Sequence, residues 1–278
     1  LIYGGNMGKW IKAANALKAR YNLHLLKKGG NYAANALSTI SAGFASNSDD
    51  LQLAYNPVNK NLWHITPALA NNTVNLSITH AAYFIELLKS NNDPRLSILA
   101  DKGAAAEYIG LTSYDQTDPT VTVNFSVNTW HSKESAPILM CTYAELKFIE
   151  AEAAFATDKP RAYSAYLAGI NASMTKFGVD AAMDSGYLAG ANVAADANSL
   201  TLGHILREKY VALFLNPETW VDMRRQNYST GVYTGLFIPA QNGGGAQRAQ
   251  YPDSEFNRNG TEVNKVKKVF TQAMWRDQ

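Results

Sequence analysis

A proline separates two predicted helices within residues 202–225, and no other feature of the sequence constrains the fold as strongly. Asn216 can end the first helix and cap the second, because its side chain can accept hydrogen bonds from free backbone N–H groups. Pro217 stands at a first-turn position that needs no donor, and Trp220 and Met223 fall on one side of the second helix. The first helix has one apolar face, made by Leu202, Ile205, Leu206, Tyr210, Leu213 and Phe214. The pattern therefore predicts packed helices.

A second helix pair is predicted over residues 142–177. Thr142 and Glu145 have the spacing of a capping box, in which each side chain reaches the other residue's free N–H. Pro160 begins the next helix after a tight turn, and Gly178 ends it. Two such antiparallel helices resemble one tetratricopeptide unit in size. One unit cannot bury its own outer face, so we expect further helices to pack against it.

Three more helices are predicted, over residues 8–28, 32–40 and 77–90. The Asn91-Asn92-Asp93-Pro94 run stops the third, because the residue before proline avoids the helical region. The inner face of the first helix is expected to hold Trp10, Ala14, Leu17, Tyr21 and Leu25. The Trp220 side chain is likewise expected in the core.

Long irregular segments separate these helices. Residues 45–75 and 101–131 are rich in polar residues and predict loops, with a short strand over 121–125. Loop is also predicted after Asn227, and residues 265–275 form a strand or short helix that closes on the body. We therefore expect a mostly α-helical protein with tetratricopeptide-like helix pairs, long loops and minor β structure.

Composition limits the classes of function. The chain has 278 residues, 46% of them hydrophobic, and no strong boundary, so residues 1–278 are expected to form a single domain. A net charge of +2 argues against a dedicated nucleic-acid binder. Cys141 is the single cysteine, so an intrachain disulfide is impossible. No apolar run reaches the roughly 18 residues needed to span a membrane.

The loops carry the residue types that hold sugars and peptides, namely flat aromatic rings beside amide and imidazole groups. One group lies within residues 45–75 and a second within residues 101–131. The alternative is that these rings fill gaps between loops and helices. The candidate ligand-binding residues are Tyr55, Asn61, Trp63, His64, Asn72, Tyr114 and Trp130.

The sequence offers no catalytic constellation. A glycosidase needs two carboxylates facing each other across a cleft, whereas Glu145, Glu150 and Glu152 lie on one predicted helix, where cap and surface roles explain them. No histidines have metal-ligand spacing, and neither a nucleophile elbow nor a phosphate loop nor a dinucleotide fingerprint is present, so no cofactor is expected. Asp49 with Asp50 could hold calcium or form a surface turn. Arg224 and Arg225 could clamp a ligand or fix Asp222, Glu218 or helix carbonyl groups.

Five segments, in order, resemble the SusD/RagB family of surface nutrient-binding lipoproteins of Bacteroidetes, especially the branch described as nutrient-binding outer membrane lipoproteins. Together they cover nearly the whole chain. They are Tyr3-Gly4-Gly5 with the helix from Trp10 to Arg20; Asn92-Asp93-Pro94-Arg95-Leu96; residues 142–153; Pro217-Glu218-Thr219-Trp220 with Asp222-Met223-Arg224-Arg225; and Arg248 with Tyr251-Pro252, Glu255 and Asn259.

The resemblance implies a SusD-like α-helical fold that caps a SusC-like TonB-dependent β-barrel at the outer membrane, on the cell surface. It implies a glycan or oligopeptide held by the loops, with no chemistry performed. Family members are usually close to twice this length. Their N-terminal part carries a lipid anchor and further helices, and we expect that part to be missing from this chain.

Two other functions stay open at this stage. A carbohydrate-active enzyme of helical fold would need opposed carboxylates across a groove. A helical repeat scaffold that binds only a protein partner would show one apolar groove and no ligand-sized pocket.

Overall fold

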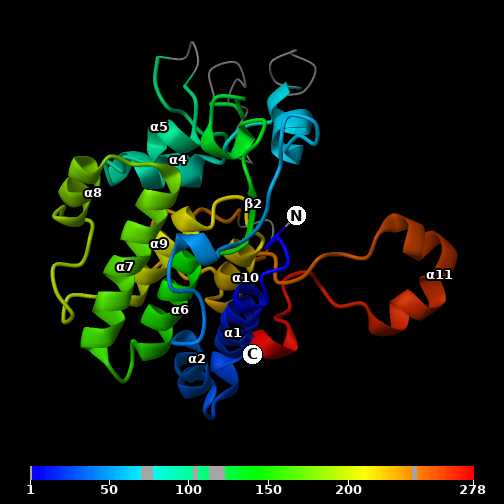
Figure 1. The fold of residues 1–278 in the computed structure, drawn as a ribbon. Helices are drawn as coiled ribbons and strands as arrows, with labels where there is room; N and C mark the ends of the chain where they lie inside the picture. The colour runs from blue at the N-terminus through cyan, green and yellow to red at the C-terminus, as the bar shows by residue number, and fades with distance from the viewer. Residues whose placement is uncertain (1, 70–77, 103–105, 113–122, 240–242) are drawn as a thin grey trace.

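The computed structural model describes residues 2–69, 78–102, 106–112, 123–239 and 243–278. It is mostly helical with one small sheet, which confirms the predicted fold class (Figure 1). In the described part, no helix is both long and apolar enough to cross a membrane. The elements are α1 (Met7–His24), α2 (Tyr32–Ile40), β1 (Leu51–Leu53), α4 (Ala82–Ser90), α5 (Leu96–Leu99), β2 (Ile138–Cys141), α6 (Tyr143–Ala154), α7 (Lys159–Phe177), α8 (Ala181–Leu188), α9 (Leu202–Ala212), α10 (Glu218–Arg225) and α11 (Asp253–Val266), with short 3-10 or π turns at Leu26–Lys28, Asn47–Asp49, His64–Ala68, Trp130–Ser132 and Trp275–Asp277.

Helix α6 is the centre of the frame. It packs against α7, α2, α9 and α1 (Figure 1). The α6–α7 pair is the predicted one, and α7 ends at Gly178 in the left-handed conformation with φ 78°. The two helices approach closely at Gly169, where a Cβ atom would lie 2.9 Å from the Phe148 ring. This close contact leaves no gap in the core between them.

The predicted inner face of α1 is wrong. Trp10 is 42% exposed and Tyr21 is 58% exposed, and Trp10 packs edge-on against Tyr3 at the surface. The face that points inward is made of small residues, Ala13, Ala16 and Ala19, followed by Leu23. Alanines let the helix axes come close together, so α1 packs tightly on α2 and α6 while its large rings lie outside.

Glu145 is not the capping side chain that the sequence predicts. The Thr142 hydroxyl does accept the Glu145 N–H at 3.1 Å, which is half of a capping box. The Glu145 carboxylate, however, is fully buried and receives two hydrogen bonds of 2.6 Å from Arg20 of α1. Arg20 also lies 3.9 Å from Glu218 of α10, so one guanidinium ties three helices together. A buried acid with such a partner fixes the position of the helices from inside the protein.

Arg225 forms a second buried cluster. Its guanidinium donates to Glu152 at 2.9 Å and 3.0 Å and to Asp222 at 2.6 Å, which confirms the predicted contact with Asp222. Lys209 of α9 approaches the other oxygen of Asp222 at 2.8 Å. Burial alone would raise the pKa of Asp222, but Lys209 and Arg225 hold it at about 2. Glu152, expected at the surface, is therefore also an interior residue.

Arg95 forms the third cluster, between α4 and α5. It is fully buried. Its Nε atom donates to Asp93 at 2.9 Å, and a terminal nitrogen of its guanidinium donates to Glu208 of α9 at 2.7 Å. The Tyr187 hydroxyl of α8 donates to the second oxygen of Glu208 at 2.5 Å. This cluster joins α8 and α9 to the turn before α5.

The sheet and three isolated bridges fix the irregular segments. Strands β1 and β2 are antiparallel, with Leu53 opposite Ile138. Isolated bridges join residue pairs 79 and 124, 81 and 111, and 101 and 124. Helix α4 therefore begins at Ala82 and not at residue 77 as predicted, because the residues before it pair with the loops. Of the predicted strand, residues 121 and 122 lie outside the described part of the chain.

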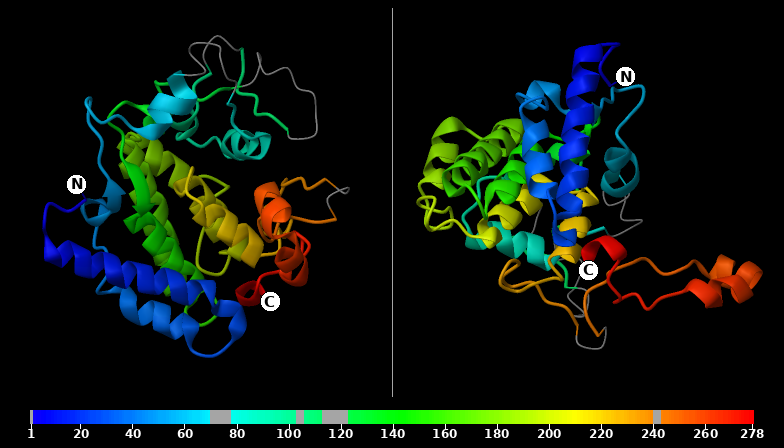
Figure 2. Two further views of the ribbon diagram at one scale, coloured as in Figure 1. Left: turned by 90° about the vertical axis from the view of Figure 1, so that its right-hand side faces the viewer. Right: turned by 90° about the horizontal axis from the view of Figure 1, so that it is seen from below.

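Three helices of the described chain were not predicted, namely α5, α8 and α11. Helix α11 stands away from the body, as the right-hand view of Figure 2 shows. Only Val263 of α11 is buried, and Asn259 has non-helical dihedral angles that kink the helix. A polar segment with this kink has no continuous apolar face, so its sequence resembled a loop. The N–H groups of Gln247 and Arg248 donate to the Phe270 carbonyl. These bonds join the two ends of the segment that carries α11.

Candidate functional site

The candidate site lies at the end of the molecule that carries α4, α5 and the irregular segments, at the top of Figure 1. Asn61 fixes the first of these segments. Its side-chain amide donates to the carbonyls of His131 at 3.2 Å and Ala136 at 2.7 Å, and its side-chain oxygen accepts the Trp63 N–H at 2.6 Å. Asn61 is fully buried, so this side chain positions the loop and does not face solvent as the sequence suggested.

His64 makes a second tie between the two loops. Its Nδ1 atom lies 2.9 Å from the Ser132 carbonyl. Lys60 and Glu134 form an ion pair of 2.6 Å close by. The loop around residue 63 and the segment around residue 132 are therefore joined, although they are far apart in the sequence.

Trp63 is the partly exposed end of a stack of rings. It stacks on Phe125 at 5.6 Å, and Phe125 stacks on His80 at 4.6 Å. His80 in turn lies 5.5 Å from Phe214, which stacks on Phe84 at 4.2 Å. This column joins the loops to α4 and to the end of α9. Trp63 is thus held by packing on one side and remains partly exposed.

Trp130 has more packing contacts than Trp63. Its ring meets Phe177 of α7 edge-on at 5.1 Å and His131 at 4.9 Å. Trp130 therefore fills the space between its loop and α7, the gap-filling role left open by the sequence. Tyr55 is half buried on the segment after β1. Asn72 and Tyr114 lie outside the described residues.

Of two buried histidines, His80 belongs to the ring column, and His131 meets Phe214 of the column edge-on at 5.3 Å. Burial lowers the pKa of His80 to about 4, and burial together with His80 lowers the pKa of His131 to about 3. Both ring nitrogens of His80 are buried, and within the described chain neither has a hydrogen-bond partner. At neutral pH both imidazoles are therefore neutral rings that pack against aromatic neighbours.

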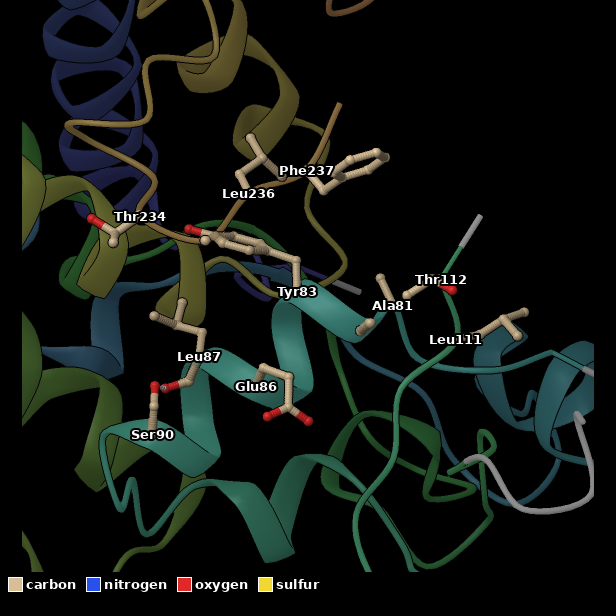
Figure 3. A pocket seen from close by; sticks show the side chains of 12 residues that line it. Ala81, Tyr83, Glu86, Leu87, Ser90, Leu111, Thr112, Thr234, Leu236 and Phe237 are labelled. Carbon is tan, nitrogen blue, oxygen red and sulfur yellow. Dashed lines mark hydrogen bonds between the residues drawn. The ribbon is translucent and has the colours of Figure 1, made fainter. Parts of the chain in front are cut away.

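A hollow of about 430 Å³ lies beside this column, between α4 and the segment after α10. Figure 3 shows the Tyr83 ring extending from α4 toward Thr234 and Leu236, with Leu111 and Thr112 of the second loop on another side. Its lining is mainly apolar, with hydroxyl groups at the edges. The volume falls within the range of small-molecule sites.

Tyr83 and Phe237 are the aromatic residues of this hollow. Phe237 is 55% exposed, so part of its side chain can be reached from solvent. Burial raises the pKa of Tyr83, so its hydroxyl stays neutral and can donate a hydrogen bond. Sequence reasoning missed both residues. Phe237 could have been found as an aromatic residue in a polar loop, whereas Tyr83 was hidden within a helical pattern.

The described lining of the hollow lacks the two opposed carboxylates that hydrolysis of a glycoside needs. Among the described residues that line it, Glu86 is the single acid, and it is exposed and paired with Lys89 at 3.0 Å. Asp49 and Asp50 are each paired with a lysine at 2.8 Å. Within the described chain, no group of three or more His, Cys, Asp or Glu side chains is arranged to hold a metal ion.

Comparison with known proteins decides the family. The sequence profile of a SusD-like family, described as starch-binding and associating with the outer membrane, matches residues 1–252. The chain belongs to the SusD/RagB family. The match ends just before α11 of this SusD/RagB protein. Among curated proteins, no relative with significant sequence similarity was found.

Solved structures of SusD homologues share the fold of this SusD/RagB protein. One from Bacteroides fragilis is 20% identical with a TM-score of 0.77, and the match covers 100% of this chain and 69% of that chain. One from Bacteroides uniformis is 21% identical with a TM-score of 0.77, covering 100% and 66%. A chitin-binding homologue from Flavobacterium johnsoniae is 22% identical with a TM-score of 0.77, covering 99% and 65%. The chain thus spans about two-thirds of these relatives, and the likeness confirms the fold.

Proposed function

We propose that this SusD/RagB protein is a non-catalytic, surface nutrient-binding subunit that holds a glycan at the end of the molecule bearing α4 and the irregular loops. The observation that carries the proposal is the aromatic-lined hollow of about 430 Å³ between α4 and residues 234–237. A sugar ring has apolar C–H faces and a rim of hydroxyls, so it suits a site with aromatic faces and hydroxyl groups at the edge. The family description and the chitin-binding relative support a carbohydrate over an oligopeptide.

Each part of the site has a role in this proposal. Tyr83 and Phe237 provide aromatic faces within the hollow, and Trp63 provides a further ring that one end of a long ligand can cover. Asn61 and His64 hold the loop that carries Trp63. Trp130 packs against Phe177 of α7 and so supports its own loop. Tyr55, Asn72 and Tyr114 stay proposed ligand contacts.

The mechanism proposed is capture without catalysis. The buried acids of α6, α9 and α10 are held by arginine and lysine, so they are not available as a general acid and base. The single acid of the hollow lacks a described carboxylate across from it, which a glycosidase requires. A bound sugar would be released unchanged or passed on.

We further propose that the ligand is passed to a SusC-like TonB-dependent β-barrel, which this protein caps at the cell surface, and that an N-terminal lipid holds it to the outer membrane. Support comes from the family description, which associates its members with the outer membrane. Affinity purification from a detergent extract of the native membrane tests this step. A large β-barrel protein should copurify, and a preparation free of any barrel protein would contradict the partnership.

Calorimetric titration with maltooligosaccharides and chitooligosaccharides tests the binding site. Phe237→Ala and Trp63→Ala should each weaken binding about tenfold, or about 1.4 kcal/mol, because each removes a ring that covers a sugar face. Trp275→Ala is the matched control, since Trp275 is 67% exposed, belongs to the C-terminal turn Trp275–Asp277 and does not line the hollow. Its affinity should match that of the unmodified protein.

Thermal unfolding of the same variants separates binding from packing. Trp63 stacks on Phe125, so Trp63→Ala should lower stability by only about 1 kcal/mol. A large fall in melting temperature with unaltered affinity would show that Trp63 only packs. Failure of both oligosaccharide series to bind would overturn the glycan proposal.

A further inference from the structure

A second hollow, of about 540 Å³, lies between α8 and the turn that follows α4. It is not part of the site described above, and its lining comes from different segments. Asn91 and Asn92 enter from the turn, and Asn192 enters from the loop after α8. Figure 1 shows α8 beside the end of α4.

The lining of this hollow matches an uncharged, hydroxyl-rich ligand. No charged side chain is among its described lining residues. Within the described chain, the carboxamides of Asn91, Asn92 and Asn192 have no protein hydrogen-bond partner. A carboxamide both donates and accepts, which complements a sugar hydroxyl that does the same. Met183 adds an apolar surface that is 61% exposed.

The floor of the hollow is held rigid. Tyr187 lines it and is 7% exposed, with its hydroxyl bonded to Glu208 and the Arg95 guanidinium 5.7 Å from its ring. This ties the floor to the third buried ion cluster of the frame. A site whose floor does not move binds with a smaller loss of conformational freedom.

Gly186 keeps the hollow open. A glycine inside a helix costs roughly 0.5–1 kcal/mol relative to alanine, so its presence needs a reason. At Gly169 the reason is packing, since a Cβ atom would lie 2.9 Å from Phe148. At Gly186 a Cβ atom would meet nothing within 4 Å, so no neighbour requires the glycine. The missing side chain instead leaves space inside the second hollow, which Gly186 lines.

The linings of the two hollows are adjacent in the sequence at the end of α4. Ser90 lines the first hollow and Asn91 lines the second. Consecutive Cα atoms are about 3.8 Å apart, so these two lining residues are close in space. A polymer of sugar rings is long enough to contact both linings, whereas a single sugar is not.

We propose that the hollow at α8 is a second saccharide subsite, which binds a neutral oligosaccharide through Asn91, Asn92 and Asn192 as the far end of a glycan held in the first hollow. This inference rests on the proposed function and adds a specificity for long chains. Two linked contacts bind a long chain more tightly than one contact, because the second forms within the same complex. Disaccharides can fill only one hollow at a time.

Titration with a length series tests the subsite. The probes are the disaccharide and the octasaccharide of both the maltose and chitin series. Gly186→Leu fills the hollow with a side chain that meets no neighbour at its Cβ atom, so the fold should be kept. It should weaken octasaccharide binding about tenfold and leave disaccharide binding at the first hollow unchanged. Gly186→Ala is the size control and should bind as the unmodified protein does.

A second pair of variants repeats the test through polar groups. Asn192→Ala should weaken octasaccharide binding several-fold, while Asn198→Ala should have no effect, since Asn198 is an exposed asparagine of the same loop that does not line the hollow. Unchanged octasaccharide affinity in Gly186→Leu, or equal loss for both lengths, would overturn the second subsite and leave the first site standing. Absence of binding by every probe would overturn both.

Discussion

At the residue scale, buried ion pairs explain why the family-like segments of this chain contain so many charges. Arg20, Arg95 and Arg225 each lie in the interior against two carboxylates. Each guanidinium joins segments that are distant in the sequence. These motifs therefore specify how the helices meet, and they do not mark where a ligand binds.

Arg225→Met should lower the free energy of unfolding by about 3–5 kcal/mol. The substitution keeps most of the side-chain volume but leaves Glu152 buried without its partner. Chemical denaturation measures the change. Lys265→Met is the control, because its pair with Glu262 is exposed and its loss should barely move the midpoint. If Arg225→Met lowers the free energy of unfolding by less than about 1 kcal/mol, the cluster does not stabilise the fold as stated.

His80 predicts how stability depends on pH. Its pKa is about 4 in the folded protein and 6.5 in an unfolded chain, so the unfolded state binds more protons between these values. The stability that the neutral ring contributes is present above pH 6.5 and is lost as pH falls through 4. His80→Phe should reduce this loss, with a residual slope from His131. Denaturation midpoints at pH 7, 5.5 and 4 test it, and identical slopes in both proteins would refute the assignment.

At the element scale, the α6–α7 pair depends on one small residue. Gly169→Ala should destabilise the protein by about 1–3 kcal/mol, because the added methyl group would overlap the fully buried Phe148 ring. Alanine is the better helix former, so propensity alone predicts the opposite sign. Gly186→Ala provides the comparison and should stabilise by roughly 0.5–1 kcal/mol. Equal effects of the two substitutions on the melting temperature would contradict the close packing.

The local sequence pattern was enough to predict most helices, but not which of their side chains are buried. Residues 32–40 and 142–177 had clear apolar periodicity and proper end signals, and they formed helices at those positions. The inner face of α1 was misplaced because periodicity favoured the large rings, whereas close packing selected alanines. Glu145 and Glu152 were given cap and surface roles, since their partners on α1 and α10 come from distant sequence.

The hollow was harder to predict for the same reason. Tyr83, Leu111 and Phe237 lie on three separate segments, and only tertiary pairing brings them together. The loops around residues 63 and 130 were predicted as irregular and rich in rings, but the sequence could not tell that Trp130 faces α7 or that Asn61 is buried. Position in a loop does not distinguish a ring that packs from one that binds.

At the scale of the whole molecule, the packed helices and the surface hollows have different roles. The helices other than α11 form a packed frame held by alanine contacts and three buried ion clusters. The aromatic hollow and the asparagine-lined hollow lie at its loop-bearing end and beside α8, on either side of the last turn of α4. On this account the frame does no chemistry, and a long glycan is held across both hollows.

Equilibrium dialysis against the octasaccharides, followed by mass spectrometry of the recovered sugar, tests this account most directly. The protein should concentrate one octasaccharide on its side of the membrane and release it with unchanged mass after long incubation. Phe237→Ala should concentrate much less of it. Steady appearance of shorter products would show that the protein is an enzyme, and equal sugar on both sides would show that it does not bind these glycans.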